Sequence, residues 1–259
     1  MGSIAIAQSL ESIIPISAVS LLFPAGGRPA VSEIRELAQN CPSFSISFDP
    51  SDEGDAENAW VELLANGLTF DLTGLGSSPV GPVPRCEHLF GLQPDFRNRP
   101  LEAITLQPGP HLAAGSTMYP VVRCMALLAA ELAALARIEA VAWHPARACS
   151  AADLFRRGVL GWIGGGAFPG LGLAALVSMS DGSLQSEGLA TFTGQELLLP
   201  AEMCHDQAQA AKIALRVLNW LVEHGRVEEQ FSFTGPGGET LLLEPVGNSG
   251  IVRLWRVAQ

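Results

Sequence analysis

The sequence predicts an α+β fold of two related α/β units, with mixed, largely antiparallel sheets and two long buried helices. Its 259 residues are 48% apolar, which is enough to bury a sizeable core. In each half an apolar strand stopped by proline precedes a helix-like run, and a later strand begins with Gly-Leu, at 67–68 and at 188–189. This repeated order indicates an internal duplication. We therefore expect an N-terminal α/β half at residues 1–136 and a C-terminal α/β half at residues 137–259, packed together as one globular unit.

Short strands and a first helix are expected at the start of the N-terminal half. The helix begins at Pro29, because proline suits the first helical turn, and it runs to Gln39. Asn66-Gly67 suits a type I′ turn, so the strands on either side of it should form a hairpin. The expected strands cover residues 18–23, 44–48, 60–64, 68–72 and 102–106, with an acidic loop at 49–58 and a linker rich in glycine and proline at 74–84.

Two long helices are expected to fill the core. The first runs from Tyr119 to Ala136, and apolar residues surround most of its circumference, which predicts a largely buried helix. The second runs from Asp206 to His224 and carries a single apolar stripe. Gly225 follows it at the position where glycine commonly ends a helix.

The C-terminal half is expected to add a hairpin and a shorter helix. Asp181-Gly182 marks the turn between strands at 173–179 and 184–193. Ser150, with Asp153 three residues later, resembles a capping box for a helix that ends near Val159. Further strands are expected at 138–143, 196–199, 240–244 and 252–257.

Composition excludes several classes of partner. The net charge of -11 argues against nucleic acid, which needs clustered basic residues. No uninterrupted apolar stretch reaches the roughly 18 residues that cross a bilayer, so no membrane association is expected. No basic residue precedes the apolar run 13–23, which favours a strand over an export signal. Because five cysteines, an odd number, are typical of reduced thiols, we expect a cytoplasmic protein.

Three segments of the C-terminal half carry a family resemblance. Val141-Ala142-Trp143 precedes a loop and helix, the returning strand reads Ser186-Glu187-Gly188-Leu189-Ala190-Thr191-Phe192, and the last long helix ends in Val222-Glu223-His224-Gly225 before Phe231–Gly238. Together they resemble a bacterial family known only as a domain of unknown function, whose motif is Thr-x-Gly-Leu-x-x-Phe-Gly. Here Ser186 stands for the threonine and Thr193 for the final glycine. The resemblance covers about residues 138–246 and implies a mixed α+β fold, with no established activity and no functional residues to carry over.

Cysteine and histidine residues are scattered along the chain. No Cys-x-x-Cys or His-x-x-x-His spacing is present, so we expect no metal and no cofactor. The glycines of 164–172 follow a helix and enter a strand, which is the wrong context for a nucleotide loop. A thiolate of Cys149 or Cys204 near a helix N-terminus, with His144 or His205 as its base, leaves a hydrolase or transferase as the alternative function. A metal site made from scattered Cys and His residues belongs to the same alternative.

A crevice between two packed units is the favoured place for a ligand. The residues expected to line it are on irregular connections, and they are Arg97, Arg99, His111, His144 and Arg147, with the loop 164–172. The arginines suit an anionic small molecule or an acidic peptide, although pairing with the surplus of acidic residues is the favoured interpretation, because exposed ion pairs are common.

We therefore expect a binding or protein-interaction module. Its partner is a small anionic ligand or another protein, and a homodimer is a further option. The apolar C-terminal segment is expected to leave a sheet edge for such a partner, through Ile251, Leu254, Trp255 and Val257.

Overall fold

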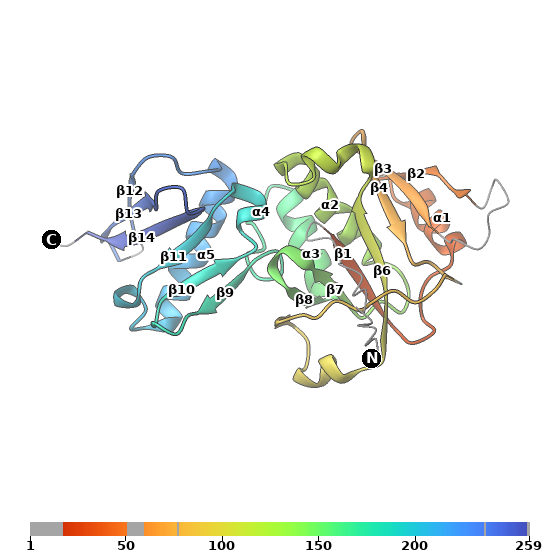
Figure 1. Ribbon diagram of the computed structural model, residues 1–259, viewed down its shortest axis with the longest axis horizontal. Helices are drawn as coiled ribbons and strands as arrows, with labels where there is room; N and C mark the ends of the chain where they lie inside the picture. Colours follow the sequence, from red (N-terminus) through yellow and green to blue (C-terminus); the bar gives the residue numbers. More distant parts are fainter. Residues whose placement is uncertain (1–17, 51–59, 77, 236, 258–259) are drawn as a thin grey trace, which may run out of the picture.

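Two sheets, each in its own lobe, make up the molecule in the computed structural model (Figure 1). The structure describes residues 18–50, 60–76, 78–235 and 237–257. The first lobe is coloured from red to green and the second from teal to blue, and the two lie end to end (Figure 1). The fold is α+β, as the sequence predicts. Most of the predicted acidic loop, and the part of the apolar run before residue 18, lie outside the described residues.

Eight strands form the first sheet, in the order β2-β3-β4-β6-β1-β7-β8-β5. They are β1 (Val19–Pro24), β2 (Ser45–Phe48), β3 (Val61–Ala65), β4 (Leu68–Thr73), β5 (His88–Phe90), β6 (Leu101–Pro108), β7 (Ala140–Trp143) and β8 (Ala148–Ala151). Every neighbouring pair is antiparallel except β5 with β8. The sheet is therefore mixed and largely antiparallel, as expected.

The core of the first lobe lies between one face of this sheet and its helices. These are α1 (Val31–Asn40), α2 (Tyr119–Leu132) and α3 (Ala152–Ile163). Nine residues of α2 are buried, so the prediction of a buried helix is confirmed. This helix packs against β1, β4 and β6 and against α3, because apolar residues cover almost its whole circumference.

The opposite face of the first sheet has a thinner cover. A second apolar cluster lies there, in which Leu22, Ala142 and Cys149 of the sheet meet Phe96 of the 3-10 helix η2 (Pro94–Asn98). The segment that carries η2 is yellow in Figure 1 and runs along the lower side of the lobe. Because this cover is mostly irregular chain, it leaves cavities beside the sheet.

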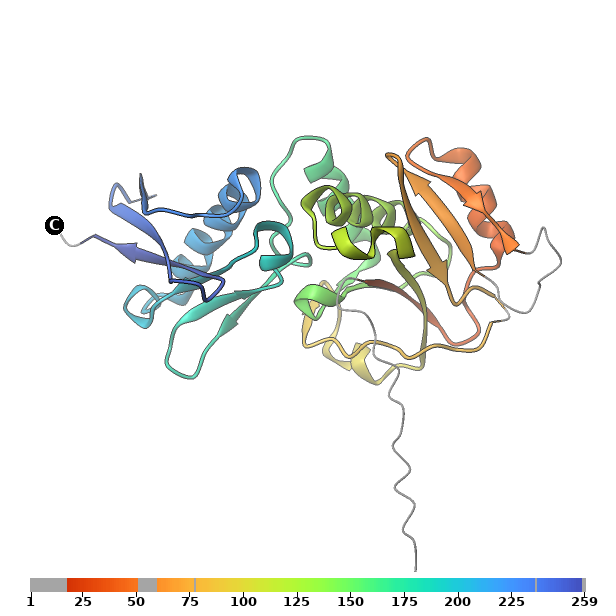
Figure 2. The same ribbon diagram turned by 45° about the horizontal axis from the view of Figure 1, so that its top comes forward.

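Six strands form the second sheet, in the order β12-β13-β14-β11-β10-β9. They are β9 (Ala175–Ser178), β10 (Leu184–Glu187), β11 (Glu196–Leu199), β12 (Phe231–Thr234), β13 (Thr240–Pro245) and β14 (Ile251–Arg256). Only β11 and β14 pair in parallel. The long helix α5 (Gln207–His224) lies along this sheet (Figure 2) and buries the predicted apolar stripe. The Asp206 carboxylate caps it by accepting a hydrogen bond from the Gln209 N–H at 3.0 Å.

The two lobes share one continuous hydrophobic core. Its aromatic centre brings together β7, α3, the loop after α3 and the short helix α4 (Ala190–Thr193). The Trp143 ring stacks on Phe192 with centroids 5.9 Å apart, and Phe168 meets Phe192 edge-on at 5.0 Å. Aromatic pairs of this geometry contribute about 0.5 to 1.5 kcal/mol beyond their burial. The lobes are thus fastened by apolar packing.

The expected division of the chain at 136/137 does not coincide with the division between the sheets. β7 and β8 lie after that point, yet they belong to the first sheet, where β7 pairs with β1. The reason is that the buried strand β1 needs hydrogen-bond partners on both of its edges, and β6 supplies only one. The chain passes between the lobes at 164–174, after α3.

The expected duplication is also wrong in its details. Gly67 lies in the turn that enters β4, whereas Gly188 follows β10 and leads into a helix. The strand expected at 184–193 therefore ends at Glu187. The two sheets differ in strand order as well. The two Gly-Leu runs are therefore alike in sequence but lie in different structural elements.

Two further local expectations need correction. Ser150 lies in β8, and the residue before α3 is Ala151, which makes no side-chain cap. β14 lies between β13 and β11, so the C-terminal strand has no free edge; β9 and β12 are the edge strands of that sheet. In the described residues, no helix combines the length and apolar character needed to cross a membrane.

Candidate functional site

The lobes approach each other closely where the 3-10 helix η4 (His144–Ala146) meets the end of β10. Gly188 sits against Ala146 so closely that a Cβ atom on Gly188 would lie 2.6 Å from the Ala146 Cβ. The φ angle of Gly188 is +91°, which favours glycine. Arg147 follows η4 in the left-handed region, with φ 46°. The backbones of η4 and of the end of β10 are therefore in close contact at this junction.

A charged cluster spans the same junction. The Glu187 carboxylate on β10 accepts hydrogen bonds from the Arg147 guanidinium, which include Nη2 to Oε2 at 3.2 Å. It also contacts the His88 ring through Nε2, at 2.9 Å. Burial alone raises the pKa of the Glu187 carboxyl, but the bonds from Arg147 and His88 outweigh it and hold this pKa below its ordinary value. The cluster therefore keeps Glu187 ionised at neutral pH.

A cavity of about 380 Å³ opens beside this cluster, and we call it the junction cavity. Its charged wall consists of Arg85, Arg147 and Glu187, and its apolar wall includes Trp143 and Pro145. The indole Nε1 of Trp143 is buried and has no hydrogen-bond partner among the described residues. The cavity thus combines an apolar surface with both signs of charge.

His144 also lines the junction cavity, and a hydrogen bond to the first sheet holds its ring in place. Its Nε2 lies 2.9 Å from the Ser20 hydroxyl oxygen on β1. A serine and a histidine at this distance could act as nucleophile and base, but Ser20 is only 1% exposed. We interpret this pair as a structural hydrogen bond that holds the η4 turn against β1.

A second cavity, of about 520 Å³, lies on the other side of the segment 84–86, and we call it the arginine cavity. Its floor is apolar and consists of Leu22, Leu89, Phe96 and Leu101. Its rim carries Arg85, Arg97 and Arg99. Pro84, Arg85 and Cys86 line both cavities, so this short segment is their common wall.

The arginines of this rim have different partners. Arg99 donates from Nη2 to the Glu139 carboxylate at 2.7 Å, so its charge is neutralised. Arg97 donates from Nε to the Cys86 carbonyl oxygen at 3.2 Å and from Nη2 to the Glu87 carbonyl oxygen at 2.6 Å. Within the described residues, Arg97 makes no ion pair with a carboxylate. It is therefore the cation of the rim best placed to receive an anion.

Four of the five residues predicted for a ligand site line these two cavities. Arg97 and Arg99 lie at one, and His144 and Arg147 lie at the other. His111 lies apart from them in η3 (Pro110–Gly115), where its ring contacts the Thr69 hydroxyl. The loop 164–172 lines neither cavity; its Gly170 lies against Leu218 of α5, so this loop serves packing.

The cysteine and histidine residues give less support to the catalytic alternative. His144 bonds to Ser20, and Cys149 is fully buried, with a pKa raised by its hydrogen bond to Cys86 and by burial. Burial also raises the pKa of Cys204. In the part of the chain that the structure describes, no group of three or more acidic, histidine or cysteine side chains could hold a metal ion.

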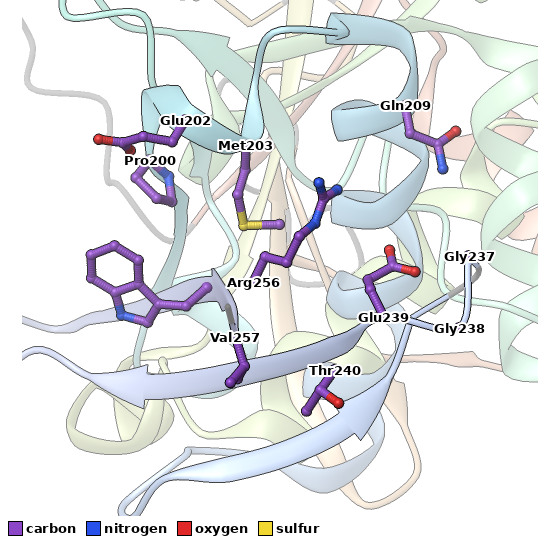
Figure 3. Close-up of a pocket in the computed structure, with 11 residues that line it drawn as sticks. Pro200, Glu202, Met203, Gln209, Gly237, Gly238, Glu239, Thr240, Arg256 and Val257 are labelled. Carbon is purple, nitrogen blue, oxygen red and sulfur yellow. The ribbon is translucent and has the colours of Figure 1, made fainter. Parts of the chain in front are cut away.

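A larger cavity, of about 930 Å³, lies in the second lobe. Figure 3 shows Met203 reaching it from the 3-10 helix η5 (Ala201–Met203), Arg256 from the end of β14 and Glu239 from the loop before β13. Its charged residues, Glu202, Glu239 and Arg256, are of both signs. It is an open groove without a set of charges that selects one ligand class, so we do not assign it the main site.

Sequence reasoning missed Cys86 and Glu187 as site residues. No motif specifies either residue, since Glu187 occupies a variable position of the quoted motif; Cys86 gains its place from the pairing of β5 with β8 and Glu187 from the contact between lobes. No protein-family model, curated protein or solved structure matches this chain. The resemblance to a family of unknown function therefore rests on the quoted motif alone.

Proposed function

We propose that the protein binds a small organic anion with an apolar body, and that the arginine cavity is its site. The observation that carries this proposal is the state of Arg97. Its guanidinium is positioned by two backbone carbonyl oxygens, and these neutral acceptors leave its charge uncompensated. Nη1 has no hydrogen-bond partner among the described residues, so it can donate to a carboxylate or phosphate.

The rest of the cavity complements such a ligand. The Arg85 side chain is 90% exposed and lies 3.4 Å from Glu87, so it can turn toward a bound anion at little cost. Leu22, Leu89 and Phe96 supply an apolar floor. Contact with this floor stabilises an apolar group by roughly 25 cal/mol for each Å² removed from water. The ligand class is therefore an amphipathic acid, such as an aliphatic or aromatic carboxylate.

A protein-interaction role is the second candidate. It is supported by the edge strand β12, whose Phe231 is 42% exposed and stacks on Trp220 with centroids 4.7 Å apart. An exposed edge with apolar side chains suits the addition of a strand from another chain. The five free cysteines support a cytoplasmic location for either role.

The binding proposal is tested with calorimetry and thermal shifts. The panel contains aliphatic and aromatic carboxylates and alkyl phosphates, with the matching uncharged alcohols as controls. Arg97→Ala should weaken binding of the best acid by about 10- to 100-fold, because a charge-assisted hydrogen bond is worth roughly 1.5 to 3 kcal/mol. Arg226→Ala, at an exposed arginine of the second lobe, should leave binding unchanged.

Two results would contradict the proposal. One is equal binding of an acid and its alcohol, which would remove the role of charge. The other is undiminished binding to the Arg97→Ala protein, which would place the ligand elsewhere.

A further inference from the structure

Two cysteines from distant parts of the sequence meet beside the candidate site. β5 and β8 pair in parallel, with Leu89 opposite Cys149. The chain just before β5 is held to β8 by a hydrogen bond from the Glu87 N–H to the Arg147 carbonyl oxygen, at 2.8 Å. This places Cys86 against the same face of the sheet as Cys149, in one apolar cluster, where the two thiols interact with each other.

The two thiols differ in access. Cys149 is fully buried under the cover of the sheet. Cys86 is half-buried and belongs to the wall shared by the junction cavity and the arginine cavity. A small solute that enters either cavity therefore meets Cys86, whereas Cys149 lines neither cavity.

Their surroundings also divide the roles of the two sulfur atoms. The hydrogen bond from Cys149 lowers the pKa of Cys86 against the effect of burial, and the positive charge of Arg97 lowers it further. The same hydrogen bond and burial raise the pKa of Cys149. Because the thiolate is the reactive form, Cys86 is the attacking cysteine and Cys149 is the resolving cysteine.

We propose that Cys86 and Cys149 form a peroxide-reactive thiol pair, in which Cys86 is oxidised and Cys149 closes a disulfide with it. The Cys86 thiolate attacks one oxygen of hydrogen peroxide, so an S–O bond forms, the O–O bond breaks and hydroxide leaves, taking up a proton to become water. Cys86 is then a sulfenic acid. The Cys149 sulfur attacks it with loss of its own proton, the S–S bond forms, and the S–O bond breaks to release a second water. The two thiols thus supply both electrons that reduce the peroxide.

Closure of the disulfide brings the sulfur atoms to about 2.05 Å, which is closer than two thiols in van der Waals contact. We expect the necessary shift to fall on residues 84–86, which lie outside any helix or strand, whereas Cys149 stays in β8. Because 84–86 is the common wall of both cavities, the disulfide fixes the shape of the candidate site. The oxidation itself does not depend on the proposed ligand.

The test is oxidation of the whole protein with stoichiometric hydrogen peroxide, followed by peptide mass mapping. The expected product is a Cys86–Cys149 disulfide that a small thiol reverses. In Cys149→Ala, Cys86 should accumulate as a sulfenic acid that dimedone captures, and in Cys86→Ala neither product should form. Arg97→Ala should slow the reaction of Cys86 by about threefold or more, because the thiolate loses a neighbouring positive charge.

Cys204 serves as the internal control, because it is half-buried and its pKa is raised by burial. The proposal is overturned if Cys204 or Cys41 oxidises before Cys86. It is also overturned if Cys149→Ala and the parent protein give equal amounts of captured sulfenic acid, since Cys149 would then not resolve it. Circular dichroism of each variant, and repetition with Cys149→Ser, separate a chemical effect from loss of folding. Loss of ligand binding with normal disulfide formation would reject the binding function alone.

Discussion

Arg147 and Glu187 join the two lobes through a hydrogen-bonded ion pair. Arg147 follows η4 in the first lobe, and Glu187 ends β10 in the second. His88 contacts the same carboxylate from β5. This carboxylate therefore connects two separate segments of the first sheet to the second one.

Acidification should weaken the protein through Glu187. Its folded-state pKa is lower than the ordinary value of 4.5, so the folded state binds fewer protons than the unfolded state in that range. The stabilisation is complete above the unfolded pKa and is lost as the pH falls through the folded pKa. Urea unfolding between pH 7 and pH 3.5 should show a smaller decrease in unfolding free energy for Glu187→Gln than for the parent. We expect the substitution to cost about 1 kcal/mol at pH 7, since Arg147 is partly exposed. Parallel curves for the two proteins would contradict this assignment.

Substitutions of Arg147 should separate its backbone from its side chain. Arg147→Ala and Arg147→Gly both remove the ion pair with Glu187, but only glycine adopts the φ angle of 46° without strain. Chemical denaturation should show the glycine variant to be more stable than the alanine variant by about 1 kcal/mol. Equal stabilities would show that the left-handed turn carries no measurable cost.

Gly188→Ala should destabilise the contact between the lobes by about 3 kcal/mol or more. The new Cβ would lie 2.6 Å from the Ala146 Cβ and 2.8 Å from its Cα, so η4 or β10 has to move. The matched control is Gly26→Ala, because Gly26 also has a positive φ of 72° but nothing lies within 4 Å of the new Cβ. The control should lose only about 1 kcal/mol. Thermal unfolding of both variants gives the comparison. Similar losses of stability would mean that the contact with Ala146 does not restrict the side chain at residue 188.

Removal of the Glu196 carboxylate should lower the stability of the folded protein. One of its oxygens accepts hydrogen bonds from the Gly188 N–H at 2.9 Å and the Ala190 N–H at 3.0 Å, and the other accepts from the Ser186 hydroxyl. Glu196→Ala removes the acceptor of these partly buried donors, which should lower the unfolding free energy by about 2 to 4 kcal/mol. Glu202→Ala, at an exposed glutamate of η5, should change it by less than about 0.5 kcal/mol. Hydrogen exchange of the Gly188 and Ala190 amides gives a second readout, and unchanged protection there would argue against the capping role.

Sequence patterns predicted the elements that are determined by residues close together in the chain. The turn at Asn66-Gly67 has positive φ at both residues, and α5 begins after Asp206 and ends before Gly225, as expected. Strands that form only by pairing with a segment distant in the sequence were harder to predict. β5 and β8 are short and were missed, because they are strands only through pairing with each other and with β7.

The candidate site divides in the same way. Irregular connections rich in arginine predicted Arg97, Arg99, His144 and Arg147, which line two adjoining cavities; their role in binding a ligand stays a prediction. The meeting of Cys86 with Cys149 could not be predicted, since 62 intervening residues separate them and no spacing rule links them. The prediction of His111 as a site residue depended only on its position before the long helix, and that position does not bring it to either cavity.

The central position of β1 has a consequence for synthesis of the chain. β1 is the first described strand, yet Val19 is aligned with Leu106 of β6 and with Trp143 of β7. A ribosome that makes about 5 to 20 residues each second completes residue 143 several seconds after β1 has emerged. Both edges of this apolar strand are open until β6 has been made, and one edge stays open until β7 has been made. An open edge is the condition under which chains pair wrongly with each other, so the exposure of β1 during synthesis lasts until residue 143 is in place.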